Sequence, residues 1–298
     1  MTGTDTMLEY GRQPTGYRLP DATRLGRVRL QVSDLGRSVA YYRDVIGARV
    51  AGVANGVATL TAHGSDDVLI ELHEKPGAAP VPRRGRLGLY HFAILVPDRP
   101  TLGRFVAHLA ELGLRAGMSD HLVSEAVYLY DPDGLGIEVY ADRPRESWSH
   151  SNRQLLMSTE PLDVPDLVAA GGGARWEGLP AGTMIGHVHL HVGELDGARA
   201  FYHDGLGLDL MVWGYQGALF MSAGGYHHHL GTNIWAGDAG AAGADEARLL
   251  EWEVLLPGGT SITEAGSSLE AAGYPVSREA GDVVAADPWG TVVRLTTG

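Results

Sequence analysis

GRVRLQVSDLGRSVAYYRDVIG, residues 26–47, recurs 160 positions later as GHVHLHVGELDGARAFYHDGLG, residues 186–207. Nine of the twenty-two aligned positions are identical, among them the glycines at both ends. The same offset aligns HFAILVP (91–97) with EWEVLLP (251–257), well outside the first stretch. Self-similarity at a fixed offset is the signature of an internal duplication. The chain is therefore made of two related halves.

Each half contains two smaller units with the same order of elements. In the first unit, the alternating pattern of residues 26–32 predicts a strand, and residues 35–45 predict an amphipathic helix that ends at Gly47. VATLTAH and VLIELHE then predict further strands. The second unit repeats this order, with its helix expected over residues 101–112. The chain thus contains four β-α-β-β-β modules, which begin near residues 26, 89, 185 and 249.

A stretch with several prolines and glycines, residues 143–183, separates the two halves, and MSTEPLDVPDLVAA within it predicts a short helix. A length of 298 residues is itself typical of two domains or one large composite. The predicted organisation is an N-terminal extension over 1–23, a first half over 24–142 with modules of about 24–75 and 86–142, the linker over 143–183, and a second half over 184–298 with modules of about 184–237 and 246–298.

The composition limits the partners and the chemistry. The formal charge is −13 and no Lys/Arg run is longer than Arg83-Arg84, which argues against nucleic acid and anionic membranes as partners. The start of the chain has neither the basic nor the apolar region of a signal peptide, and no window holds the roughly 20 apolar residues of a membrane span, so we expect a cytoplasmic protein. There is no cysteine, so any metal ion must be held by histidine and carboxylate side chains.

Three histidines alternate with apolar residues in GHVHLHV, residues 186–192. Successive side chains of a strand point to opposite faces, so His187, His189 and His191 share one face. The apolar residues between them are expected to pack in the core, which leaves the histidines facing a polar cavity. An isolated strand histidine is more often a hydrogen-bonded residue than a metal ligand. Metal ligands can therefore be assigned only where several candidate side chains match a set of ligand positions together.

The helix phrase S-D-L-x-x-S-x-x-Y-Y, the strand ending D-P-D-G-x-x-I-E-V-Y and the fourfold repeat together resemble the vicinal-oxygen-chelate superfamily of glyoxalases and extradiol dioxygenases. Within it, GLYHFAIL, DPDGLGIEVYADRP, IGHVHLHV and SAGGYHHHLG resemble the bacterial catechol 2,3-dioxygenase group. The likeness covers nearly the whole chain. It implies an α+β fold in which the modules form two cup-shaped sheets, around a cavity where a divalent metal ion lets two adjacent substrate oxygens chelate.

The resemblance also implies a ligand set of two first-strand histidines and one last-strand carboxylate. The corresponding first-strand positions are Arg27, His91, His187 and Glu251, and the last-strand positions are Glu71, Glu138, a neutral residue within 231–233, and Arg294. Only His91, His187 and Glu138 supply the set. Two histidines and a carboxylate imply Fe(II), with Mn(II) as the next candidate. Glu71 is left open between a relic of a metal position and a surface strand residue.

Extradiol cleavage needs a group that accepts and returns protons, and histidine suits this role near neutral pH. The resemblance makes His229 of GGYHHHLG the expected acid-base residue, with His228 as the alternative if the strand register shifts. The resemblance also implies that Tyr128 hydrogen-bonds a substrate oxygen and that His121 is a second active-site histidine. The other interpretations are a solvated histidine loop, a packing tyrosine and an exposed turn histidine.

Further side chains are candidates for the cavity wall. His189 and His191 are expected to orient ligands or substrate. Trp213, Tyr215 and Trp235 are candidates for the wall of an aromatic pocket, although large aromatic residues are more often part of the core.

Charge predicts how the modules pair. Arg27 and Arg29 share one face of their strand, Glu251 and Glu253 share one face of theirs, and Arg294 lies on the last strand. Buried charges need partners, so modules one and four are expected to form an ion-paired cup. Modules two and three, which carry the expected ligands, then form the metal-bearing cup. The alternative is the conventional pairing of one with two and three with four.

The sequence thus predicts an Fe(II)-dependent extradiol dioxygenase that cleaves a small aromatic diol with O2. One alternative is a glyoxalase-like metal-dependent isomerase or lyase. Another is a non-catalytic binding or resistance protein of the same fold, an idea that the altered positions Arg27, Glu251 and Arg294 keep open. The sequence does not fix the ring substituents, the choice between proximal and distal cleavage, or whether the chain forms a homo-oligomer.

Overall fold

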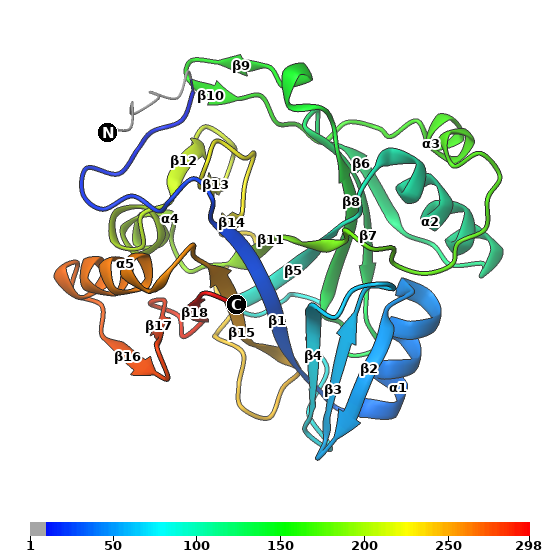
Figure 1. Cartoon of the computed structure of the whole chain (residues 1–298), viewed down its shortest axis with the longest axis horizontal. Helices are drawn as coiled ribbons and strands as arrows, with labels where there is room; N and C mark the ends of the chain where they lie inside the picture. Colours follow the sequence, from blue (N-terminus) through cyan, green and yellow to red (C-terminus); the bar gives the residue numbers. More distant parts are fainter. Residues whose placement is uncertain (1–9) are drawn as a thin grey trace.

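Two eight-stranded sheets make up most of the fold (Figure 1). The structure is a computed structural model that describes residues 10–298, so the start of the predicted extension, residues 1–9, lies outside the described residues. The histidine sheet has the order β12 (Asp209–Val212), β13 (Ala218–Ser222), β14 (Leu230–Asn233), β11 (Met184–His191), β5 (Gly88–Leu95), β8 (Gly136–Asp142), β7 (Ser124–Tyr130), β6 (Gly117–Asp120). The arginine sheet has the order β16 (Val276–Glu279), β17 (Asp282–Ala286), β18 (Val292–Thr296), β15 (Arg248–Leu255), β1 (Arg24–Val32), β4 (Val68–Glu74), β3 (Val57–Thr61), β2 (Arg49–Ala54). A small hairpin of β9 (His150–Ser151) and β10 (Gln154–Leu155) forms a separate pair.

Each large sheet joins one module from each half of the chain. In the histidine sheet, β11 of module three pairs antiparallel with β5 of module two. In the arginine sheet, β1 of module one pairs antiparallel with β15 of module four. The structure therefore confirms the α+β fold with two cup-shaped sheets, and it confirms the pairing of modules two with three and one with four. The two modules of each half therefore lie in different sheets, which is not the conventional pairing.

One helix follows the first strand of each module. These helices are α1 (Leu35–Tyr41), α2 (Arg99–Glu111), α4 (Leu195–Ala198) and α5 (Gly259–Ala271), and the linker contains the expected short helix as α3 (Val164–Ala170). The helix predicted over residues 35–45 changes after Tyr41 into a wider π-helical turn, which ends at Gly47 with φ of 84°. Glycine suits this left-handed end because it has no Cβ. Figure 1 shows α2 and α3 together at one side of the molecule and α4 and α5 at the opposite side.

The two sheets pack back to back through the apolar faces of their central strands. Val28 and Leu30 of β1 and Val188 and Leu190 of β11 are fully buried and belong to one core cluster. Because side chains alternate along a strand, the polar residues between them point the other way, onto the concave face of each sheet. The concave faces are therefore where the histidines of β11 and the arginines of β1 lie.

A repeated tyrosine–aspartate contact links consecutive modules across the sheets. Tyr42 Oη of module one lies 3.4 Å from Asp131 Oδ2 of module two, and Tyr202 Oη of module three donates to Asp287 Oδ2 of module four at 2.9 Å. All four side chains are buried, and burial raises the pKa of Asp131 to about 7. The aspartates begin the DPDG and DPWG turns, so this part of the repeat holds the two sheets together.

The described part of the N-terminal extension packs on the edge of the histidine sheet. Arg12 exchanges two backbone hydrogen bonds with Leu210 of β12. The Arg18 guanidinium donates to the Asp209 carboxylate at 2.7 Å. These contacts fix the extension beside the sheet whose concave face carries the expected metal ligands.

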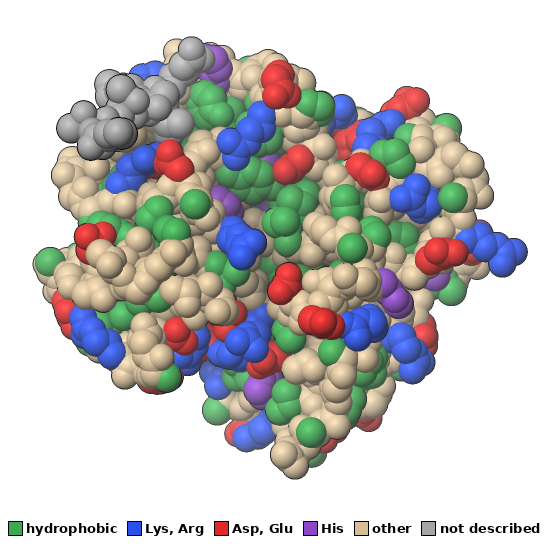
Figure 2. Space-filling view, in the orientation of Figure 1, with side chains coloured by type: hydrophobic (Ala, Val, Ile, Leu, Met, Phe, Trp, Pro, Cys, Tyr) green, Lys and Arg blue, Asp and Glu red, His purple; other side chains and the backbone are tan. Residues whose placement is uncertain are grey.

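The face drawn in Figure 2 carries Lys and Arg, Asp and Glu, and apolar side chains in a mixed distribution. A mixed surface of this kind does not focus a field of one sign on a charged partner. Within residues 10–298, no helix has the length and apolar character needed to cross a membrane.

Candidate metal centre

Three side chains of the histidine sheet converge because of the register of its central strands. Glu138 of β8 and His187 of β11 both lie opposite Ala93 of β5, one on each side. The small Ala93 side chain lets the two longer side chains approach each other. His91 precedes Ala93 by two residues and shares its face. The sheet thus brings together the three residues that the sequence analysis expected as ligands.

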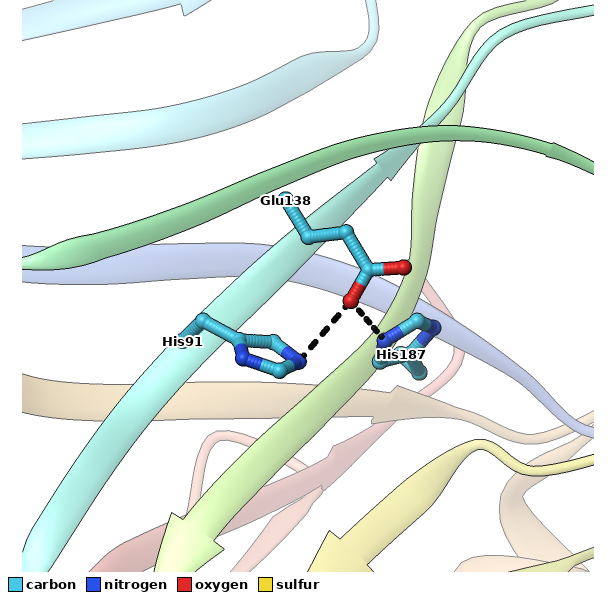
Figure 3. A group of neighbouring side chains, drawn as sticks. All are labelled: His91, Glu138 and His187. Carbon is cyan, nitrogen blue, oxygen red and sulfur yellow. Dashed lines mark hydrogen bonds and ion pairs between the residues drawn. The ribbon is translucent and has the colours of Figure 1, made fainter. Parts of the chain in front are cut away.

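The candidate ligand atoms of this group lie close to one another (Figure 3). Glu138 reaches between the two histidines, with Oε2 at 3.0 Å from His91 Nε2 and 3.2 Å from His187 Nε2. All three side chains are buried, and their candidate ligand atoms lie within 4.8 Å of one another. The contact with His187 has hydrogen-bond geometry, whereas His91 Nε2 has no hydrogen-bond partner within residues 10–298. A buried polar atom without a hydrogen-bond partner is unusual in a native protein, and a bound ion is one group that would satisfy it.

The protonation states of the group suit a cation. Burial acts to raise the pKa of Glu138, but the close contacts with His187, and then with His91, hold the pKa well below its ordinary value. Burial lowers the pKa of His187 to about 4, although Glu138 opposes this. At neutral pH we therefore take Glu138 as ionised and His187 as neutral. An ionised carboxylate without a permanent positive partner is costly to bury, and a divalent cation would compensate it.

The His187 ring is held by its neighbours on the sheet. Tyr140 of β8 packs against it, with ring centroids 4.8 Å apart. Gly186 makes this approach possible, because a Cβ at that position would lie 1.9 Å from Tyr140 Oη. The glycine before the first histidine of GHVHLHV is therefore needed for the packing of that histidine.

Asn233 of β14 bridges the other two histidines of β11. Its Nδ2 donates to His189 Nε2 at 2.9 Å, and its Oδ1 accepts from His191 Nδ1 at 2.6 Å. His189 lines the cavity beside the ligand group. His191 is not among the residues that line this cavity, and its ring lies against Tyr90 with centroids 4.7 Å apart. The three histidines therefore share a face but have different surroundings.

A cavity of about 240 Å³ opens beside the ligand group. It is lined by Tyr90, His91, Ser119, His121, Tyr128, Glu138, Met157, Ser158, Thr159, His189, Tyr215, Phe220, His228 and Trp235. A cavity of about 150 Å³ is enough to bind benzene, so this one has room for a single substituted aromatic ring. Of the candidate wall residues, Tyr215 and Trp235 line it, whereas the Trp213 ring lies 4.0 Å from the Arg12 guanidinium, away from the cavity wall.

Tyr128 and His121 form a hydrogen-bonded pair on the cavity wall. Tyr128 lies directly opposite Glu138 in the ladder between β7 and β8. The carbonyl oxygen of Ser158 can only accept, so His121 Nδ1 donates to it at 2.6 Å, and His121 Nε2 accepts from Tyr128 Oη at 2.5 Å. Burial, followed by the charge of Glu138, raises the pKa of Tyr128 well above its ordinary value, so the hydroxyl stays protonated. The structure places both residues at the cavity.

His228, and not His229, lies beside the expected ligands. The His228 ring is buried, and its centroid lies 4.1 Å from that of His187. His229 lines a separate cavity, next to Arg145, and its Nδ1 accepts from the Ala223 backbone at 3.2 Å. The expectation that His229 faces the ligand group is therefore corrected, and His228 takes that place. β14 begins at Leu230, so the histidine run lies in the preceding loop, where strand alternation does not decide which side chain faces the cavity.

Ion pairs occupy the equivalent positions of the arginine sheet. The six charged side chains on its concave face are Arg27, Arg29, Arg294, Glu71, Glu251 and Glu253. Arg27 Nε donates to Glu253 at 2.7 Å, and Arg29 contacts both Glu71 and Glu251. The ion pairing predicted from charge is confirmed. Glu71, which the sequence left open, is a buried member of this network.

The linker contributes to the cavity in a way that the sequence does not predict. Met157, Ser158 and Thr159 line it, and the Ser158 carbonyl anchors His121. Hydrophobic periodicity locates strands and helices but does not encode the path of a loop, so no local signal places this segment. Phe220 of β13 was also missed, because ALFMS is apolar at four successive positions and does not indicate which face points to the cavity.

Comparison of the sequence with known proteins finds relatives. Residues 24–139 match the family model described as Glyoxalase/Bleomycin resistance protein/Dioxygenase superfamily. A protein of Bacillus subtilis (strain 168) named catechol-2,3-dioxygenase is 44% identical over 270 residues. The aligned region covers 89% of this chain and 94% of that protein.

Solved structures show the same fold at low sequence identity. A protein of Bacillus subtilis subsp. subtilis str. 168 covers 94% of this chain and 86% of its own length, with a TM-score of 0.63 and 12% identity. Glyoxalase I from Zea mays covers 92% of each chain, with a TM-score of 0.52 and 17% identity. At such identities the likeness extends to the fold alone.

Proposed function

Because the chain belongs to the Glyoxalase/Bleomycin resistance protein/Dioxygenase superfamily, we propose that it is an extradiol dioxygenase. It opens the ring of a catechol-type substrate next to the two adjacent hydroxyl groups and incorporates both atoms of O2. It binds one Fe(II) ion through His91, His187 and Glu138, and Mn(II) is the other metal of suitable chemistry. The observation that carries the proposal is the convergence of these side chains beside a cavity sized for one aromatic ring.

The residues present fit such an ion. Two imidazole nitrogens and one carboxylate oxygen on one side of a site are typical of non-haem Fe(II) oxygenases, because the remaining positions stay open to substrate. The unpartnered His91 Nε2 and the uncompensated charge of Glu138 both favour a cation at this place. When bound, the ion supplies a Lewis acid for the two substrate oxygens and the redox chemistry that activates O2.

The Tyr128–His121 pair would hold one substrate oxygen. The Tyr128 hydroxyl faces the cavity next to Glu138, and His121 fixes its direction through the 2.5 Å hydrogen bond. Because its hydrogen is donated to His121, the Tyr128 oxygen can accept a hydrogen bond from a substrate hydroxyl and so set the orientation of the ring.

His228 takes the acid-base role that the sequence analysis gave to His229. It lines the cavity on the side opposite Tyr128, against the His187 ring. Burial lowers the pKa of His228 well below its ordinary value, so the free ring is a neutral proton acceptor at neutral pH. Its role is to accept the proton of a substrate hydroxyl and to return it later to the ring-opened product.

The cavity wall favours an uncharged ring. Met157, Tyr215, Phe220 and Trp235 contribute apolar surface, and none of the described residues that line the cavity is Lys or Arg. A carboxylate substituent on the substrate would therefore be desolvated without a cationic partner, which is costly. Catechol and its alkyl derivatives fit this wall better than aromatic diols that carry an acid group.

Product analysis tests the proposal. The protein loaded anaerobically with Fe(II) should convert catechol, in air, to a ring-opened product whose mass exceeds that of catechol by both atoms of O2, and isotopically labelled O2 should label it at both positions. Protein loaded with Mn(II) should form the same product. Metal binding without oxygen uptake for any catechol, together with isomerisation of a glutathione hemithioacetal, would instead support the glyoxalase-like alternative.

A further inference from the structure

A hydrogen-bonded chain runs from the cavity to the end of β8. His227 Nε2 lies 2.9 Å from Asp142 Oδ1, and His227 Nδ1 lies 2.7 Å from His228 Nδ1. The His227 side chain is fully buried, and that of Asp142 is 28% exposed. Glu138 and Asp142 are four residues apart on one strand and therefore share a face. β8 thus supplies one carboxylate to the ligand group and a second one behind the cavity histidine.

The direction of these hydrogen bonds follows from what each atom can do. An ionised carboxylate only accepts, so His227 Nε2 must carry the hydrogen that it donates to Asp142. A neutral His227 then has a lone pair on Nδ1. A contact of 2.7 Å between two ring nitrogens holds one hydrogen, so that hydrogen belongs to His228 Nδ1. The other nitrogen of His228, Nε2, is left with a lone pair.

We propose that Asp142 and His227 are positioning residues that hold His228 in the tautomer whose free Nε2 can accept a proton in the cavity. The inference rests on the proposed function for its catalytic consequence, but the tautomer itself is a property of the metal-free protein. The arrangement resembles the general case in which a buried carboxylate orients a catalytic histidine through the opposite ring nitrogen. Here a second imidazole stands between the carboxylate and the histidine that it orients.

The side chains around Asp142 and His227 favour this direction of the hydrogen bonds. Tyr226 Oη donates to the same Asp142 oxygen at 3.1 Å, and Tyr140 Oη lies 2.7 Å from Tyr226 Oη. Trp148 packs against the His227 ring with centroids 5.4 Å apart. The Asp142 oxygen therefore receives two donors, which favours its role as an acceptor.

Nitrogen NMR of the metal-free protein reads the tautomers directly. In protein with ¹⁵N-labelled histidine, His228 should show a protonated Nδ1 and an unprotonated Nε2, and His227 should show a protonated Nε2. The His228→Gln variant assigns the signals of His228. A His228 that is protonated on Nε2, or a His227 that is protonated on both nitrogens, would overturn the inference.

The Asp142→Asn variant should reverse the direction of the hydrogen bonds between Asp142, His227 and His228. An amide nitrogen can donate to His227 Nε2, which moves the hydrogen of His227 to Nδ1 and so forces the hydrogen of His228 to Nε2. The NMR spectrum should show both changes. In the Fe(II)-loaded enzyme kcat for catechol should fall by roughly 10²- to 10⁴-fold, the usual contribution of a positioned proton acceptor, with KM and metal content unchanged. Asp142→Glu, which keeps the accepting carboxylate, should restore most of kcat.

Asp282→Asn is a matched control. The Asp282 side chain is 27% exposed and contacts Arg294 in the arginine sheet, so this variant also removes a partly exposed, partnered carboxylate. It should leave the tautomers and kcat unchanged. An equal loss of kcat in both variants, or an Asp142→Asn protein with wild-type tautomers, would overturn the inference. If the tautomers are as expected but no catechol is cleaved by the wild-type protein, the proposed function fails and the hydrogen-bond assignment stands.

Discussion

The histidine sheet and the arginine sheet have the same strand order but neutralise their concave faces in different ways. His189 pairs with His91 at the centre of one sheet, and Arg29 pairs with Glu251 at the same place in the other. Arg29 corresponds to His189, and His91 to Glu251, through the repeat offset of 160 residues. The last-strand position that holds Glu138 in one sheet holds Arg294 in the other.

The difference lies in how the two sheets compensate the carboxylates on their concave faces. A guanidinium is permanently charged, so Arg29 and Arg294 compensate Glu251 without any bound ion. Within residues 10–298 no Lys or Arg pairs with Glu138; its partners are His91 and His187, and burial lowers the pKa of His187 to about 4. On the proposed function, a divalent ion would compensate Glu138 in the histidine sheet, whereas the arginine sheet is compensated by its own side chains.

The largest expected effect separates His187 from Arg27, which are equivalent positions of the repeat. His187→Ala removes a ligand and should reduce oxygen consumption with catechol to the background level. Arg27→Ala breaks ion pairs in the other sheet and should leave turnover per folded chain unchanged, although the protein becomes less stable. Equal loss of turnover in the two variants would show that the sheets are not functionally distinct.

A smaller effect is expected from the two neighbouring histidines of the loop before β14. His228→Gln should lower kcat for catechol by roughly 10²- to 10⁴-fold because it removes the proposed proton acceptor. His229→Gln should leave kcat unchanged because His229 lines a different cavity. Steady-state kinetics with confirmed metal content checks both variants. The reverse order would return the acid-base role to His229.

The stability of the two sheets should respond differently to loss of a carboxylate. Glu251→Ala removes one carboxylate partner from both Arg29 and Arg294, which keep their contacts with Glu71 and Asp282. It should lower the free energy of unfolding by at most about 3 kcal/mol, because breaking a buried pair costs about 3 to 5 kcal/mol and both arginines are partly exposed and retain partners. In metal-free protein, Glu138→Gln removes an uncompensated charge and should not lower stability. Urea unfolding measures both, and similar losses would contradict the difference in charge compensation.

The last expected effect concerns pH. Burial lowers the pKa of His229 to about 3 in the folded protein, below the ordinary value near 6.5 in the unfolded chain. Between these values the unfolded chain binds the extra proton, so stability is complete above about pH 6.5 and falls as the pH decreases toward 3, by at most about 1.4 kcal/mol per pH unit. His229→Asn should reduce this slope in urea unfolding at pH 4 to 7. An unchanged slope would mean that His229 is protonated in the folded protein.

Much of this arrangement could be predicted from the sequence, because it depends on periodic strands. Alternation placed His187 on a cavity face, the resemblance to extradiol dioxygenases implied His91 and Glu138 as its partners, and the offset of the repeat related His187 to Arg27 and His91 to Glu251. The pairing of the modules followed from the same rule, because alternation grouped the charges by face and buried charges need partners.

The remaining features depend on segments that have no period. His228 and His229 precede β14 in a loop, so their directions are set by tertiary packing rather than by alternation. The linker residue Ser158 reaches the cavity along a path that its composition does not encode. The bond between Asp142 and His227 joins modules two and three, and only the folded sheet shows that these residues meet.

Metal analysis of three proteins tests most directly whether the ion belongs to the histidine sheet alone. After anaerobic loading with Fe(II) and removal of free metal, the wild-type protein and Glu251→Ala should each retain one ion per chain, and Glu138→Ala should retain none. Retention by Glu138→Ala together with loss from Glu251→Ala would place the ion in the arginine sheet and contradict the assignment of His91, His187 and Glu138.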